Sequence, residues 1–195
     1  LLINVHHVAF DGVSSDVMLR ELASIYRATS MADSVAGGGL PTLPVQYVDF
    51  TLWQRSIELA PFIEEQRGYW QERLHSGALP VLELPLDHPR PAVQTFNGDA
   101  APFSINASTV ASLEGLTRVH ACTIFQVVLA LWALLLCRHA EQDEVVIGSP
   151  YHGRDAAGTE TLIGYFVNML ALLVEAPRGS TVATVLHGAR EAAAG

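Results

Sequence analysis

The chain has 195 residues, of which 50% are hydrophobic and 16% charged, and its formal net charge at pH 7 is −9. This composition excludes a disordered chain, because it holds enough apolar surface for a core. Eleven Lys and Arg residues against twenty Asp and Glu argue against nucleic-acid binding and against docking on anionic membranes, both of which need a basic face. Two cysteines and no Cys/His cluster with zinc spacing predict a reducing, cytoplasmic compartment and no metal site.

The two ends of the sequence indicate an internal segment of a longer polypeptide. The chain begins at Leu1 inside a mostly apolar run and closes in a helical pattern at 191–195. The basic region and cleavage site of a signal peptide are not seen. The apolar run 122–137 is shorter than the roughly 20 residues that span a bilayer, so we expect a buried helix there.

The predicted elements alternate between strands and helices. Residues 1–5 form a short apolar run that predicts a buried strand. A helix capped by Ser14 or Ser15 follows and runs to Thr29, because apolar residues recur at helical spacing. A loop over 31–44 and a helix over 50–74, broken near Pro61, come next.

The second half of the chain continues this alternation. Four prolines make 80–93 an extended connector, because proline fixes φ and lacks a donor hydrogen. Beyond it we expect a strand at 102–105, helices at 108–119 and 123–138, strands at 145–149 and 169–175, and a helix that Ser180 caps and that runs to His187. Together these elements predict an α/β or α+β fold.

The segment His6-His7-Val8-Ala9-Phe10-Asp11-Gly12 carries the strongest chemical signal. Adjacent histidines on an extended segment point to opposite sides, so we expect one to face a cavity and the other to pack inward. Asp11 lies past the turn and is expected to hold the loop and the working imidazole. Gly12 lets the backbone approach a substrate closely. A neutral imidazole accepts a proton near pH 7.

Other interpretations of this segment stay open at this point. Among eight histidines an adjacent pair arises by chance, and Asp-Gly is a common turn. His7 and Asp11 have the i, i+4 spacing of two metal ligands, but this needs a helix where a turn is expected, and a third ligand is not evident. Since the sequence has no Gly-x-Ser-x-Gly elbow and no Cys in an activating motif, we favour acyl transfer without an enzyme nucleophile.

Three motifs in one order resemble a known family. Residues 6–12 match HHxxxDG, residues 47–54 are similar to YxDFAxWQ, and residues 163–168 are similar to IGxFVN. Between them, Tyr69-Trp70 and the segment 84–91 resemble the connector of the same family. The chain is thereby identified as similar to the condensation domains of non-ribosomal peptide synthetases, in the chloramphenicol-acetyltransferase-like superfamily.

The resemblance implies an α/β fold of the α+β sandwich type with two lobes and a channel between them. It assigns 1–79 to the end of the N-lobe, 80–95 to the lobe connector and 96–195 to the first part of the C-lobe. It implies upstream and downstream peptidyl carrier proteins as partners, with an adjacent adenylation domain in the same megasynthase. Substrates would arrive on the phosphopantetheine of the carriers, and no cofactor would be bound directly.

The resemblance also implies a role for individual residues. His7 would be the catalytic histidine, His6 its structural neighbour, and Asp11 a site residue paired with an arginine upstream of Leu1. Gly12 would present backbone to the substrates, and Asn168 would line the channel. Tyr47, Asp49 and Trp53 would hold structure.

The implied reaction is amide condensation, and two alternatives remain. Val13 stands where the family often has Trp, and Asp-Gly-Val-Ser is similar to epimerization domains. Ser15 and the run 166–168 depart from the epimerization pattern, so condensation is favoured. A non-catalytic, condensation-like recruitment module is the other alternative. We expect the 195-residue segment by itself to be inactive, because half of the channel walls would be absent.

Overall fold

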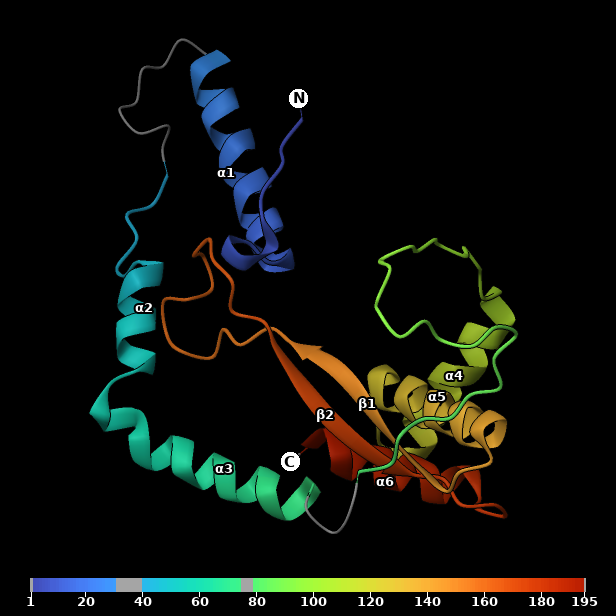
Figure 1. Cartoon of the computed structure of the whole chain (residues 1–195). Helices are drawn as coiled ribbons and strands as arrows, with labels where there is room; N and C mark the ends of the chain where they lie inside the picture. Colours follow the sequence, from blue (N-terminus) through green and yellow to red (C-terminus); the bar gives the residue numbers. More distant parts are fainter. Residues whose placement is uncertain (1, 31–39, 75–78, 195) are drawn as a thin grey trace. The chain divides into compact units, whose positions relative to one another are not determined.

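The computed structural model describes residues 2–30, 40–74 and 79–194 (Figure 1). These residues form two compact units. Unit 1 comprises Leu1–Arg73 and Pro150–Leu170, and unit 2 comprises Leu74–Ser149 and Ala171–Gly195. Mixed helices and strands are the fold class that the sequence predicts. The lobe boundaries at 79 and 96 stay a prediction.

Two strands pair in a sheet of their own. Strand β1 (Glu144–Tyr151) and strand β2 (Asn168–Glu175) are hydrogen-bonded neighbours. Both confirm strands that the sequence predicts, each slightly longer than expected. Leu172 and Val174 are buried in β2, as the two-residue period of a strand requires for one core-facing side.

Unit 1 begins with a short 3-10 turn, η1 (His7–Ala9), that leads into helix α1 (Gly12–Ser30). The residue that caps α1 is Asp11, whose Oδ1 accepts the backbone N–H of Ser14 at 2.8 Å. The prediction that Ser14 or Ser15 caps this helix is therefore wrong. Ser14 lies in the first turn of α1, and its hydroxyl contacts distant segments of the chain instead of accepting a backbone N–H of that turn.

The predicted helix at 50–74 is two helices with a turn between them. At the start of helix α2 (Tyr47–Gln54), Asp49 Oδ2 accepts the backbone N–H of Gln46 at 2.8 Å, and the backbone carbonyl oxygen of Gln46 accepts the N–H of Asp49 at 3.0 Å. Turn η2 (Ile57–Leu59) separates it from helix α3 (Ala60–Leu74). The predicted break near Pro61 is confirmed, since α3 begins at Ala60. Proline is tolerated in the first turn of a helix but not in its interior, so a helix cannot continue through Pro61 from the preceding segment. The predicted loop at 31–44 lies for the most part outside the described residues.

The prediction of strands at 1–5 and 102–105 is wrong for the residues that the structure describes. Residues 2–5 and 102–105 are exposed and have no regular secondary structure. A strand needs a neighbouring backbone for its hydrogen bonds, and the described sheet consists of β1 and β2 only. An apolar pattern alone cannot supply that neighbour.

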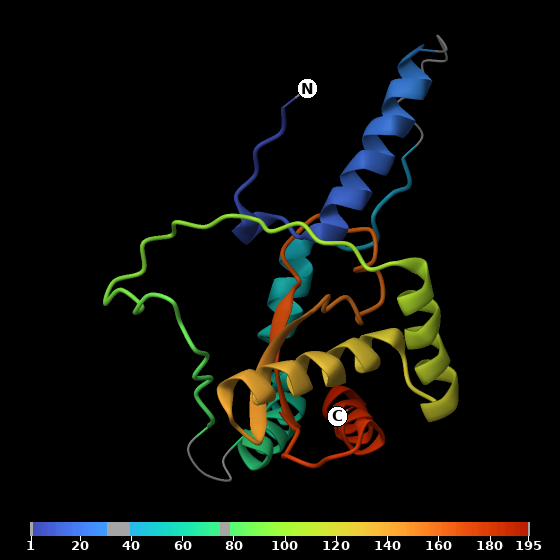
Figure 2. The same ribbon diagram turned by 90° about the vertical axis from the view of Figure 1, so that its right-hand side faces the viewer.

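Unit 2 contains three helices packed on one another. Helix α4 (Ala107–His120) is capped by Asn106, and helix α5 (Ile124–Ala140) by a capping box of Thr123 and Gln126. Helix α6 (Val182–Ala194) follows β2. Helix α5 contacts both α4 and α6, and α4 also contacts α6; in Figure 2, α6 lies below α5 and α4 stands at one end of it. Buried apolar side chains of α5 and α6 form much of the core: Val127, Leu129, Ala130, Ala133, Cys137, Val185, Leu186, Ala189 and Ala192.

The helices of unit 2 confirm the helices predicted from the sequence, except for the cap and the end of the last one. Both predicted helices at 108–119 and 123–138 are present. The final helix is capped by Thr181, whose Oγ1 accepts the backbone N–H of Thr184 at 3.2 Å, and not by Ser180. It also continues beyond His187 to Ala194.

The described helices include none that is by itself long and apolar enough to cross a membrane. Helices α4 and α5 pass that test of length and composition only as a pair, and they meet at an angle of 105°.

Candidate functional site

The two adjacent histidines lie on the η1 turn of unit 1, and both are exposed. His6 Nδ1 accepts the backbone N–H of Val8 at 3.0 Å and so caps the turn. His7 Nδ1 lies 2.7 Å from the carbonyl oxygen of Phe10. The expectation that one histidine packs inward is wrong, because the chain turns at His7 and both rings stay at the surface.

The contact with Phe10 determines the tautomer of His7. A carbonyl oxygen only accepts hydrogen bonds, so Nδ1 must carry the hydrogen. In the neutral ring, Nε2 is then left with its lone pair free. The exposed His7 ring is therefore arranged to accept a proton through Nε2.

The carboxylate of Asp11 is buried and fully engaged by donors of unit 1. Its Oδ1 accepts from Ser14 N–H at 2.8 Å and from Arg154 Nη2 at 2.9 Å. Its Oδ2 accepts the backbone N–H of Phe166 at 3.1 Å. Burial alone raises the pKa of Asp11, but these hydrogen bonds outweigh it and lower the pKa below its ordinary value.

The partner of Asp11 is Arg154, and the expected arginine upstream of Leu1 is not needed for this pair. Arg154 is buried, with Nη1 donating to the carbonyl oxygens of Thr159 and Leu162 at 2.7 and 2.8 Å. Its guanidinium carbon lies 4.0 Å from the centre of the Phe166 ring. The sequence analysis missed Arg154, although it stands nine residues before the motif at 163–168 and is the only arginine between β1 and β2.

Ser14 links helix α1 to the third motif. Its buried hydroxyl lies 2.8 Å from both Asp11 Oδ1 and the carbonyl oxygen of Gly164, and it has one proton to donate. The same oxygen accepts the backbone N–H of Gly164 at 3.0 Å. Ser14 thus fixes the main chain of Gly164 beside the first turn of α1.

The second motif packs on the third through aromatic rings. Tyr47 and Phe50 of α2 lie with ring centres 5.0 and 4.8 Å from that of Phe166. The Tyr47 hydroxyl donates to the carbonyl oxygen of Tyr165 at 2.7 Å. A side chain at Gly164 would collide with the Tyr47 ring, since an added Cβ would lie 2.7 Å from Cε2. The three motifs therefore meet in one unit.

The remaining predicted site residues lie around this cluster. Apart from its chain neighbours and the backbone of α1 itself, no described atom lies within 4 Å of the place that a Cβ on Gly12 would occupy, so this side of its backbone is open. Asn168 is exposed, and its Nδ2 donates to the carbonyl oxygen of Phe166 at 3.1 Å. Gly153, with φ +62°, permits a close approach to that same carbonyl.

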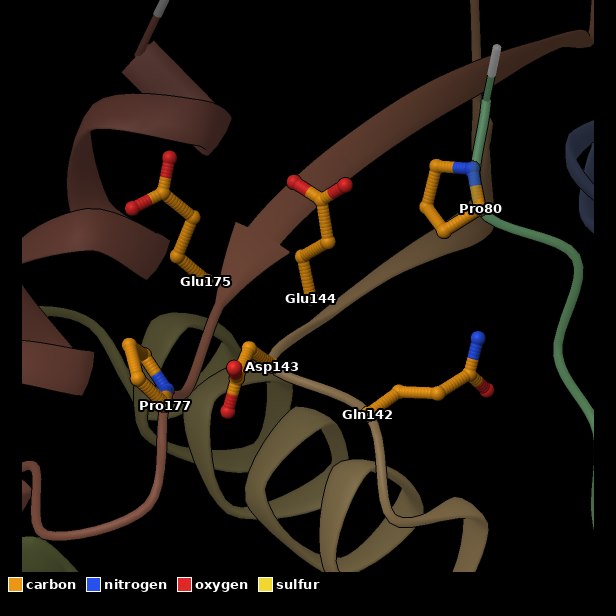
Figure 3. A pocket seen from close by; sticks show the side chains of 6 residues that line it. All are labelled: Pro80, Gln142, Asp143, Glu144, Glu175 and Pro177. Atoms are coloured by element: carbon orange, nitrogen blue, oxygen red, sulfur yellow. The ribbon is translucent and has the colours of Figure 1, made fainter.

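Within the described ranges, no group of three or more His, Cys, Asp or Glu is arranged to hold a metal ion. Both oxygens of Asp11 already accept N–H donors. Unit 2 has a separate cavity of about 350 Å³ lined by the residues labelled in Figure 3. None of the predicted site residues lines it. Its lining includes Gln142 and three carboxylates, Asp143, Glu144 and Glu175.

Comparisons with known proteins agree with one another. A family model described as Condensation domain matches residues 1–194. A linear gramicidin synthase from Brevibacillus parabrevis is 38% identical over 192 residues, or 98% of this chain and 2% of that protein. Malpinin synthetase from Mortierella alpina is 39% identical over 199 residues, or 96% of this chain and 2% of that protein.

A solved structure with the same fold is the X-domain from teicoplanin biosynthesis in complex with OxyB. It has a TM-score of 0.81 and 26% identity, over 96% of this chain and 42% of that one. The chain thus spans less than half of this structural relative and 2% of the two curated relatives.

Proposed function

The chain belongs to the condensation-domain family, and on that premise we propose that it takes part in amide-bond formation during non-ribosomal peptide synthesis. The donor is an acyl or peptidyl thioester, and the acceptor is the amine of an aminoacyl thioester. The observation that carries the proposal is the exposed His7 ring, whose Nδ1 is held by Phe10 and whose Nε2 has no hydrogen-bond partner among the described residues.

In this mechanism the acceptor amine attacks the thioester carbonyl, a C–N bond forms and the C–S bond breaks. His7 Nε2 orients the amine and takes its proton, which then passes to the leaving thiolate. An α-amine has a pKa of about 7.7–8.0, so roughly a tenth or more is neutral at pH 7. Alignment of two tethered substrates contributes as much as ~7–11 kcal/mol. Proton transfer through His7 then adds about 10²–10⁴-fold.

Asp11 acts on this site through the loop and does not touch the substrates. Its carboxylate is buried against Arg154, Ser14 and Phe166. Because it also caps α1, it holds the start of the helix that follows the two histidines. The neighbouring residue, Gly12, has a backbone that is open to a substrate. Asn168, the last residue of the third motif, lines the channel.

The partners follow from the same premise. The substrates are delivered on the phosphopantetheine arms of upstream and downstream carrier proteins, with an adenylation domain in the same polypeptide. No cofactor is bound directly, and the location is cytoplasmic. The curated relatives support the proposed partners, since this chain matches a small part of a linear gramicidin synthase and of a malpinin synthetase.

Two other functions are consistent with the family. A recruitment module is favoured by the likeness to the X-domain, whose solved structure is a complex with OxyB. An epimerization domain is the other, on account of Val13. The first would bind partners without forming amide bonds. The second would exchange the α-proton of the bound substrate with solvent.

The test is His7→Ala in the intact synthetase, with both carriers loaded. We expect condensation to fall about 10²–10⁴-fold while the carriers still bind. His139→Ala, which removes another exposed histidine, is the matched control and should leave the rate unchanged. An unchanged rate for His7→Ala would remove His7 from the mechanism. Exchange of the α-proton without amide formation would instead assign the epimerization function.

A further inference from the structure

We propose that Tyr165, which occupies the variable position of the motif at 163–168, is a positioning residue for the His7 imidazole. The inference rests on the proposed function, in which His7 takes the proton of the acceptor amine. It concerns a side chain to which the motifs assign no role. Tyr165 and His7 belong to the same unit and are 158 positions apart, so only the fold brings them together.

The contact between the two rings is an edge-to-face pair. Their centres are 5.5 Å apart, and their planes are inclined by 83°. This geometry is the preferred one for aromatic pairs, because the positive edge of one ring meets the negative face of the other. The phenol ring of Tyr165 therefore holds the imidazole in one orientation.

The main chain of Tyr165 is fixed on both sides and at its own carbonyl. Gly164 donates its N–H to the Ser14 hydroxyl, and Phe166 donates its N–H to Asp11. The carbonyl oxygen of Tyr165 itself accepts from the Tyr47 hydroxyl at 2.7 Å. As a result, the Tyr165 ring has a fixed base although it is 37% exposed.

Among the described residues, Tyr165 adds a second restraint on the His7 ring. The hydrogen bond from Nδ1 to Phe10 opposes rotation of the ring about Cβ–Cγ, but it lies at the exposed surface, where water competes for it. The edge-to-face contact with Tyr165 opposes the same rotation, so that Nε2 keeps one direction. Proton transfer depends on such alignment, and its loss lowers turnover more than substrate binding.

The experiment compares Tyr165→Leu with Tyr165→Phe in the full-length synthetase. The Leu variant removes the ring, whereas the Phe variant keeps it and removes only the hydroxyl. We expect Tyr165→Leu to lower kcat for condensation about 2- to 12-fold with KM unchanged, the range that corresponds to one aromatic pair. Tyr165→Phe should restore the wild-type rate. Tyr26→Leu removes a 73% exposed tyrosine of α1 and is the matched control.

A second readout does not depend on activity. Diethyl pyrocarbonate modifies accessible imidazoles, and peptide mass spectrometry then compares His7 with His6, which serves as an internal reference. We expect the ratio of His7 to His6 modification to rise in Tyr165→Leu and to stay at the wild-type value in Tyr165→Phe. Equal unfolding midpoints of the variants establish that the comparison is made on folded protein.

Two results would overturn the inference. One is a Leu variant with wild-type kcat and wild-type modification ratio, which would mean that the ring does not hold His7. The other is a Phe variant as impaired as Leu, which would assign the effect to the hydroxyl. If the wild-type protein forms no amide bond, the proposed function fails, and the modification ratio still decides whether Tyr165 positions His7.

Discussion

Arg154 donates from Nη2 to Oδ1 of Asp11 at 2.9 Å, and the two side chains are 4% and 0% exposed. The pair joins the segment before α1 to the loop after β1 across 143 positions of sequence. Because Phe166 contacts both partners, the ion pair also holds the third motif. Together with the local hydrogen bonds of η1, this buried pair holds the histidine loop beside Tyr165.

Removing the cation should be strongly destabilising. Arg154→Met leaves the buried carboxylate of Asp11 without its counter-charge, which costs about 3–5 kcal/mol in the free energy of unfolding. Urea denaturation measures this loss. Arg67→Ala breaks an exposed pair with Glu64 of the same unit and should change stability by less than about 0.5 kcal/mol.

A double variant checks that the loss arises from the pair itself. Asp11→Asn with Arg154→Met removes both charges, so it should lose less than the sum of the two single variants. Additive losses would show that the two side chains stabilise the unit independently.

The stability supplied by Asp11 should depend on pH in acid. The pKa of Asp11 is lowered in the folded state, because hydrogen bonds from Ser14, Phe166 and Arg154 outweigh the effect of burial. Its contribution is therefore complete above the unfolded pKa of about 3.9 and is lost as the pH falls through the lower folded value.

Unfolding midpoints of wild type and Asp11→Asn between pH 7 and pH 2 provide the measurement. The difference between them should be constant at neutral pH and should shrink below about pH 4. A difference that stays the same at every pH would contradict an ionised Asp11 in the folded state.

A methyl group at Gly164 should disturb the contact between the second and third motifs. In Gly164→Ala the new Cβ meets the Tyr47 ring, and such overpacking costs about 1–3 kcal/mol. Gly68→Ala is the matched control, since it lies inside α3 and, apart from its chain neighbours and the backbone of that helix, no atom of the described residues lies within 4 Å of its added Cβ. That change should stabilise the helix by about 0.5–1 kcal/mol. Thermal unfolding of the two variants provides the measurement. Equal changes in their unfolding midpoints would contradict the contact between Gly164 and the Tyr47 ring.

The side-chain amide of Gln142 should hold the proline-rich segment of unit 2. Its Nε2 donates to the carbonyl oxygen of Val81 at 2.9 Å, and its Oε1 accepts the N–H of Glu83 at 3.1 Å. Loss of two hydrogen bonds corresponds to about 1–3 kcal/mol, so Gln142→Ala should raise cleavage near Val81 about 5- to 150-fold in limited proteolysis. Gln142→Glu keeps the acceptor and should give a smaller increase. Equal cleavage of all three proteins would exclude this role.

The helices and the strands of the sheet could be predicted because their causes are local. Helix α5 follows from its apolar run, with Thr123 and Gln126 as the capping box. Strands at 1–5 and 102–105 were wrongly predicted from patterns of the same kind, since a strand also requires a partner backbone. The caps at Asp11 and Thr181 were missed because a neighbouring serine satisfied the same local rule.

The sequence by itself determined the helices, the three motifs and the family, because these depend on residue type and on spacing along the chain. Only the tertiary structure decided that Arg154 neutralises Asp11, that Ser14 binds Gly164 and that Tyr165 meets His7. Such pairs join residues more than a hundred positions apart, and their choice depends on burial and on how the loops close. No local pattern encodes which of several arginines or tyrosines will arrive there.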